Sequence, residues 1–116
     1  MREIKFRAWD KKSKGWRYWV LGRDCMCDLE IYDLLTHYGQ YTNLKDKNGS
    51  EIFEGDIIKY LYNEQNGEWV LGEVRWTNGL FEIHDDINVV TELLGDVAHI
   101  SKIIGNIHQN PELLGD

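Results

Sequence analysis

The segment Glu54-Gly55-Asp56-Ile57-Ile58-Lys59-Tyr60-Leu61-Tyr62 (EGDIIKYLY) lies near the middle of the chain and has the sequence of a β-strand entered through a tight turn. Glycine accepts positive φ at a turn, and an aspartate accepts hydrogen bonds from the turn's backbone amides. Two more strand-like segments follow at residues 68–76 and 80–84, joined by the turn residues Asn78-Gly79. The pattern predicts an antiparallel meander. Gly72 interrupts the second segment and predicts a bulge or bend there.

The first 21 residues predict a β-hairpin. Residues 4–9 alternate apolar and polar side chains, and residues 16–21 are rich in aromatic and β-branched residues that favour strands. Lys5 and Arg7 occupy alternate positions of the first strand, so they share the face opposite its apolar residues. The hairpin therefore has an almost wholly basic charged face.

The other segments predict short elements, which are, in chain order, a loop or short helix at 24–37, an extended run at 38–44, a hairpin turn at 45–49, short strands at 97–100 and 103–108, and one helical turn at 110–114. We therefore expect an α+β, β-rich fold. It has a basic N-terminal β-hairpin lobe at residues 1–48 and a small acidic unit at residues 49–116. Within that unit, a small antiparallel SH3-like β-barrel runs from Ile52 to His108 and ends in a short helical turn. The boundary falls at the hairpin turn expected near residues 45–50, and the two parts form one compact unit.

Length and composition restrict the class of protein. A chain of 116 residues with 42% hydrophobic residues forms one packed domain and is too small for a large multi-site enzyme. The chain shows neither a signal-peptide core nor an apolar run of about 20 residues, so we expect a soluble cytoplasmic protein without membrane contact. Cys25 and Cys27 are too close for a structural disulfide, and with His37 they make an incomplete metal site. We expect reduced thiols, no metal and no cofactor.

Charge is distributed unevenly along the chain. Residues 1–23 hold eight basic and two acidic side chains, a net charge of +6, whereas residues 24–116 hold five basic and eighteen acidic ones, a net charge of −13. Lys5, Arg7 and Arg17 form the hypothetical basic binding face. This face can bind the phosphates of nucleic acid, dock on the acidic surface of a second copy, or pack on the acidic body of its own chain.

Three blocks of sequence are similar to those of a known family. They are Met1-Arg2-Glu3-Ile4-Lys5-Phe6-Arg7-Ala8-Trp9-Asp10, the stretch from Gln40 to Gly49 followed by Ile52-Phe53-Glu54-Gly55-Asp56-Ile57, and the stretch from Ile104 to Leu114. In this order they resemble the YopX-like proteins of bacteriophages and prophages. The resemblance covers nearly the whole chain, although residues 11–37 match only loosely. It implies a β-rich fold with a small barrel, self-association and a phage or prophage gene, and it carries no catalytic residues because the family's function is uncharacterised.

One position departs from the family pattern, which has glycine where this chain has Asn43. Asparagine is the next most tolerant residue of left-handed backbone geometry, so a turn that needs positive φ survives the change.

Candidate catalytic and ligand residues each have a structural alternative. His84-Asp85-Asp86 offers an acid–base or metal cluster, but adjacent strand residues point to opposite faces, which favours a solvated loop. His99 and His108 have no nucleophile motif beside them, so they favour structural or surface roles. Glu54 and Asp56 favour a turn over a carboxylate pair. The chain has no glycine-rich phosphate loop.

The aromatic residues Trp9, Trp16, Tyr18, Trp19, Trp69 and Trp76 can stack on nucleobases if exposed, but a domain of this size favours them as core. Together these patterns predict a non-catalytic phage accessory protein that acts by self-association and by binding a host or phage protein. The alternatives are a nucleic-acid-binding module that uses the basic hairpin and, third, a small enzyme with an unrecognised site.

Overall fold

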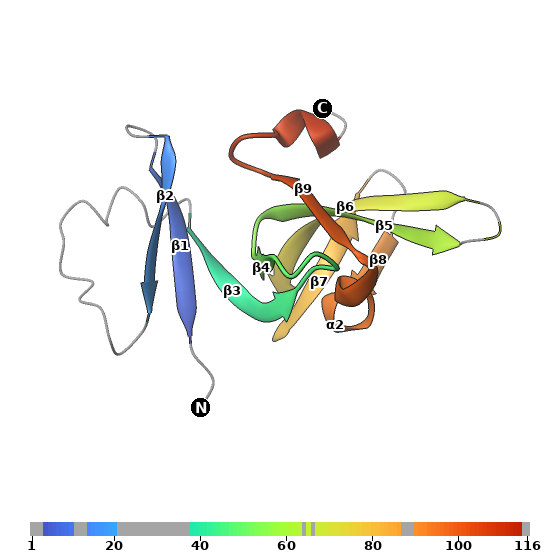
Figure 1. Cartoon of the computed structure of the whole chain (residues 1–116), viewed down its shortest axis with the longest axis horizontal. Helices are drawn as coiled ribbons and strands as arrows, with labels where there is room; N and C mark the ends of the chain where they lie inside the picture. The colour runs from blue at the N-terminus through green and yellow to red at the C-terminus, as the bar shows by residue number, and fades with distance from the viewer. Residues whose placement is uncertain are drawn as a thin grey trace.

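The computed structural model describes residues 4–10, 14–20, 38–63, 65, 67–86 and 90–114. In this part of the chain two antiparallel sheets account for most residues (Figure 1). The first has the order β2-β1-β3-β4 and contains β1 (Lys5–Asp10), β2 (Gly15–Val20), β3 (Tyr38–Lys45) and β4 (Glu51–Phe53). The second has the order β8-β7-β6-β5-β9 and contains β5 (Asp56–Asn63), β6 (Glu68–Thr77), β7 (Leu80–Asp85), β8 (Val90–Leu93) and β9 (Lys102–Asn106). The N-terminal hairpin and the central meander are confirmed, while the loop or helix expected at 24–37 lies outside the described residues.

The main core lies on the inner face of the five-stranded sheet. Alternate residues of β5, β6 and β7 point inward, and Ile52 from β4 and Leu94 pack against them. The β5–β6 ladder runs through Gly72 without a register shift, so the bulge predicted there is wrong. A Cβ at this position would lie 2.6 Å from Cγ2 of Ile83, so the glycine allows two neighbouring strands to pack closely.

The segment between β8 and β9 is helical. The helix α2 (Leu94–Val97) continues into the 3-10 turn η2 (Ala98–Ile100), so the strand expected at residues 97–100 is wrong. The buried residues Leu94, Val97 and Ala98 follow helical spacing, and the hydroxyl of Ser101 donates to the carbonyl of Ala98 at 2.8 Å to close the turn. The helical turn expected near the C-terminus is confirmed as the 3-10 turn η3 (Pro111–Leu114).

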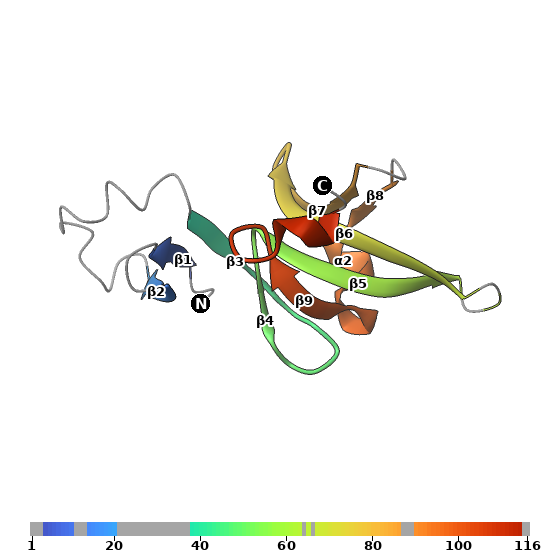
Figure 2. The ribbon, with the colours of Figure 1, turned by 90° about the horizontal axis from the view of Figure 1, so that it is seen from above.

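Strand β3 joins the two halves of the molecule. It pairs with β1 around Gly39 and Gln40 and with β4 at Tyr41 and Lys45, with a register shift between the last two residues. Asn43 lies within this shift and has φ +65°, the left-handed geometry that the family's glycine predicts. Figure 2 shows β3 running from β1 and β2 at one end of the molecule toward the five-stranded sheet at the other.

The turn between β3 and β4 is anchored by Asp46. Oδ1 of this buried carboxylate accepts hydrogen bonds from the amides of Asn48 and Ser50, both at 2.9 Å, and Oδ2 accepts one from the amide of Ile103 at 3.1 Å. The hairpin turn predicted at residues 45–49 is therefore present, and it is tied to β9. This turn also spans the boundary expected between residues 48 and 49, because β3 ends before that boundary and β4 begins after it.

Candidate functional site at the junction of the two sheets

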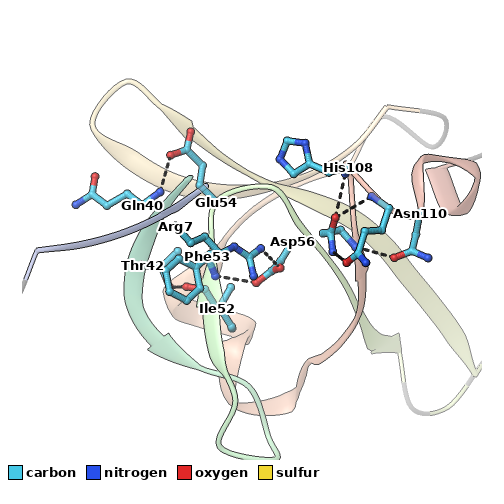
Figure 3. Close-up of polar contacts among 11 residues, drawn as sticks. Arg7, Gln40, Thr42, Ile52, Phe53, Glu54, Asp56, His108 and Asn110 are labelled. Atoms are coloured by element: carbon cyan, nitrogen blue, oxygen red, sulfur yellow. Dashed lines mark hydrogen bonds and ion pairs between the residues drawn. The ribbon is translucent and has the colours of Figure 1, made fainter. Parts of the chain in front are cut away.

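A buried ion pair connects β1 to the start of β5. Nη2 of Arg7 donates to Oδ1 of Asp56, and the amide of Phe53 donates to Oδ2 at 2.7 Å (Figure 3). Arg7 is 7% exposed and Asp56 is 2% exposed, so water reaches neither side chain freely. Burial raises the pKa of Asp56, and Arg7 and the Phe53 amide oppose that shift. The aspartate that opens β5 thus fixes both its own turn and the N-terminal hairpin.

Aromatic rings enclose the guanidinium of Arg7. Its Cζ lies 3.8 Å from the ring centroid of Trp16 and 4.6 Å from that of Phe53. The ring of Trp16 meets that of His108 edge-on at 5.8 Å. Cation–π contacts strengthen when the cation is desolvated, as it is here. The junction therefore brings together β2, β4 and the C-terminal segment around one arginine.

The C-terminal segment that carries His108 is shaped by asparagines. Oδ1 of Asn106 accepts from the amides of His108 at 3.0 Å and of Gln109 at 2.9 Å, while Oδ1 of Asn110 accepts from the amide of Asn106 at 3.3 Å. A Cβ on Gly105 would lie 2.6 Å from Oδ1 of Asn110, so a larger residue there would displace the Asn110 side chain. These contacts shape the segment on which His108 meets Trp16, and Figure 3 shows His108 beside Asn110 in this segment.

Glu54 lies at the rim of the junction. Gly55 has φ +92°, and Glu54 and Asp56 flank it in a turn, so their spacing serves the turn that the sequence favours. Oε1 of Glu54 accepts from the amide of Gln40 at 3.3 Å. Burial raises the pKa of Glu54, repulsion from Glu73 adds to that shift, and the Gln40 amide opposes it.

The three residues predicted to form a basic face do not share one surface. Lys5 and Arg7 lie on the face of the hairpin that meets the body, where Nζ of Lys5 binds Oε2 of Glu51 at 2.8 Å. Arg17 is the cross-strand partner of Ala8, so it lies on the opposite face, and its Nε is 3.3 Å from Oδ2 of Asp10. The alternation of β1 therefore separates Arg17 from the other two, and each cation pairs with a carboxylate of its own chain.

The histidine cluster on β7 does not converge. His84 lies on the outer face of the five-stranded sheet, whereas Asp85 is buried on the other side of the strand. Nε2 of His84 is 3.4 Å from Oγ1 of Thr77 and 3.3 Å from Oε1 of Glu82. A nucleophile relay needs the hydroxyl and the carboxylate on different ring nitrogens, so this geometry is not such a relay.

The neighbouring acid Asp86 lies on the surface and pairs with Arg75 at 2.6 Å, and this hydrogen bond lowers the pKa of Asp86. His99 is exposed on η2. In the described part of the chain no group of three or more histidine, cysteine or acidic side chains is placed to hold a metal ion. Cys25, Cys27 and His37 lie outside the described residues.

The aromatic residues divide between core and surface. Trp19 is 7% exposed, whereas Tyr18, Trp69 and Trp76 are 56%, 54% and 51% exposed. Trp9 and Trp16 are half-buried, so the expectation that most of the six form the core is wrong. Exposed aromatic side chains are typical of binding surfaces.

The sequence matches the family model of the YopX protein over residues 22–115. The chain belongs to the YopX family. It is similar to the solved structure of protein EF1440 from Enterococcus faecalis, with 28% identity and a TM-score of 0.59 over 96% of this chain and 97% of that one. It is also similar in fold to protein yopX from Bacillus subtilis, with 19% identity and a TM-score of 0.59 over 99% and 98% of the two chains. No curated protein matches it.

The YopX resemblance has a structural explanation. Its three sequence blocks meet at the junction, because they contribute Arg7, the Phe53-Glu54-Gly55-Asp56 turn and the Asn106 to Asn110 segment. None of the helices among the described residues is long and apolar enough to cross a bilayer. The contacts of the junction hold the two sheets together.

Proposed function

We propose that this YopX-family protein acts without catalysis, by self-association and by binding another protein. The observation that carries the proposal is the tip of the β6–β7 hairpin. Trp76 and Leu80 are 51% and 53% exposed there, beside the turn residues Asn78 and Gly79, which have φ +52° and +84°. Successive positive φ angles are those of a tight hairpin turn. Large apolar side chains held out on a well-defined turn are suited to insertion into a protein partner.

The arrangement of the second sheet supports a partly open SH3-like barrel as the scaffold. A meander of four strands, β5 to β8, is followed by the short helix α2 and the 3-10 turn η2, and the last strand β9 returns to pair with β5. SH3-like barrels have this connectivity, and they host many unrelated binding functions. The family resemblance supports a phage or prophage gene and a role in the bacterial cytoplasm.

Light scattering over a range of protein concentrations tests the proposal. We expect the mass of the wild-type protein to rise with concentration and that of the Trp76→Ser/Leu80→Ser variant to stay at one chain. Ile100→Ser is the matched control, because Ile100 is also exposed but lies on η2. A wild-type protein that remains a monomer at every concentration would refute self-association.

The nucleic-acid alternative is tested by titrating labelled single- and double-stranded oligonucleotides at two salt concentrations. Lys5, Arg7 and Arg17 are already paired with carboxylates, so we expect no salt-dependent binding. Binding that weakens as salt rises would favour the alternative over protein binding.

A further inference from the structure

Two lysines face each other across β5 and β9. Lys59 and Lys102 are direct partners in the antiparallel ladder, so both side chains lie on the outer face of the five-stranded sheet. Neither forms an ion pair with any described residue, in contrast to Lys5, Arg7, Arg17 and Arg75. Like charges placed directly opposite destabilise a sheet. An anionic group bound between them would remove that repulsion.

An exposed tryptophan extends this pair. Nζ of Lys59 lies 4.6 Å from the ring centroid of Trp69, which is 54% exposed. Leu71 is the partner of Lys59 in β6, and Leu61 is the partner of Trp69, so all five side chains share the outer face. We call these residues the lysine–tryptophan face: Lys59, Leu61, Trp69, Leu71 and Lys102. Buried aromatic anchors with charged neighbours are typical of binding hot spots.

We propose that the lysine–tryptophan face docks against an acidic surface of a second copy of this chain. The proposal rests on the proposed self-association and assigns it a contact surface. Residues 24–116 carry a net charge of −13, so each copy has an excess of carboxylates that a basic face can meet. A basic face that meets a different, acidic face of the next copy makes a head-to-tail contact, which electrostatic complementarity favours and orients.

Charge also favours a second copy of the chain over nucleic acid as the partner of the lysine–tryptophan face. The face offers two lysines that form no ion pair with a described residue, and the chain as a whole has a net charge of −7, which repels a long polyanion. A second copy can present a few carboxylates locally and apolar side chains for Trp69 and Leu71. Because an exposed aromatic ring can also stack on a base, a single-stranded oligonucleotide belongs in the test.

The test compares two charge-matched variants of the full chain. Lys59→Gln/Lys102→Gln removes the cations of the face, and Lys45→Gln/Lys47→Gln removes the same charge from two exposed lysines near the β3–β4 turn. Analytical ultracentrifugation at low and high salt gives the dissociation constant of each. We expect the first variant to self-associate about tenfold more weakly at low salt, since two solvent-exposed ion pairs are lost, and the control to change by less than about twofold.

The outcomes separate the inference from the proposed function. If Lys59→Gln/Lys102→Gln associates like the wild type while Trp76→Ser/Leu80→Ser does not, self-association stands and the docking surface is wrong. A monomeric wild type overturns both. Binding of a single-stranded oligonucleotide to the wild type that disappears in Lys59→Gln/Lys102→Gln would assign the face to nucleic acid and overturn the proposal. Circular dichroism should show unchanged folding, because Lys59 and Lys102 project from the outer face.

Discussion

Replacing Arg7 by methionine tests the role of the buried ion pair. The change removes the guanidinium but keeps a long apolar side chain between the rings of Trp16 and Phe53. Asp56, at 2% exposure, then keeps only the amide of Phe53 as a partner for its charge. Leaving one member of a buried pair uncompensated destabilises a protein by about 3–5 kcal/mol. Because domains of this size are stable by about 5–15 kcal/mol, Arg7→Met should lose a large part of the free energy of unfolding.

The assay is urea denaturation followed by circular dichroism on the single variants and the double variant. Adding Asp56→Asn to Arg7→Met removes the unpaired charge and should recover about half of the loss. The loss in Arg7→Met should also shrink as pH falls, because protonation of Asp56, whose pKa burial already raises, neutralises it. Arg7→Lys keeps the charge and is expected to fold if Arg7→Met does not, with a loss of about 1–2 kcal/mol because the ammonium lacks the planar guanidinium's contacts with the rings of Trp16 and Phe53.

The reasoning is refuted by either of two results. One is an Arg7→Met variant whose free energy of unfolding lies within about 1 kcal/mol of the wild type, well short of the loss expected for a broken buried pair. The other is a double variant that is less stable than Arg7→Met alone, which would show that the carboxylate is not the source of the instability.

Three more variants test local features. Asn43→Ala should lower stability by about 1 kcal/mol in thermal denaturation because alanine resists positive φ, whereas Asn43→Gly should match or exceed the wild type. An Asn43→Ala variant as stable as the wild type would contradict this. Glu54→Gln should raise the free energy of unfolding at neutral pH by less than about 1 kcal/mol, because burial raises the folded-state pKa of Glu54 and the stability of the wild type falls as pH rises through that pKa. Urea titrations should show that this gain fades on acidification, and a gain that does not change with pH would contradict the reasoning. Gly72→Ala should cost about 1–3 kcal/mol because its Cβ would meet Ile83, and an unaffected melting temperature would disprove that packing.

Local residue patterns predicted the strands well because each is encoded within a few residues. Alternation in residues 4–9 and the Asn78-Gly79 pair correctly indicated the N-terminal hairpin and the β6–β7 turn. The bulge predicted at Gly72 was wrong because a glycine needed for close packing looks the same in sequence as one needed for a bulge. Residues 97–100 were misread because four residues are too few to distinguish strand from helical spacing.

The candidate site was less predictable because its members are distant in sequence. The alternation of β1 showed that Lys5 and Arg7 share a face, but it did not show that they form ion pairs with Glu51 and Asp56. The lysine–tryptophan face left a partial signal, since the sequence Ile58-Lys59-Tyr60-Leu61 alternates and Lys59 therefore faces away from the core. Its pairing with Lys102 depends on β9 returning to β5, which no local pattern specifies.

The change of strand partner along β3 limits where the chain can be cut or recombined. Strand β3 pairs with β1 in its first half and with β4 in its second half, so both parts of the four-stranded sheet depend on it, and the Asp46 turn ties it to β9. Cutting the chain between residues 48 and 49 would divide that hairpin and leave unpaired strand edges on both fragments. The basic hairpin is therefore not a transferable module, and recombination that exchanges it between relatives must carry the Asp56 turn along with it.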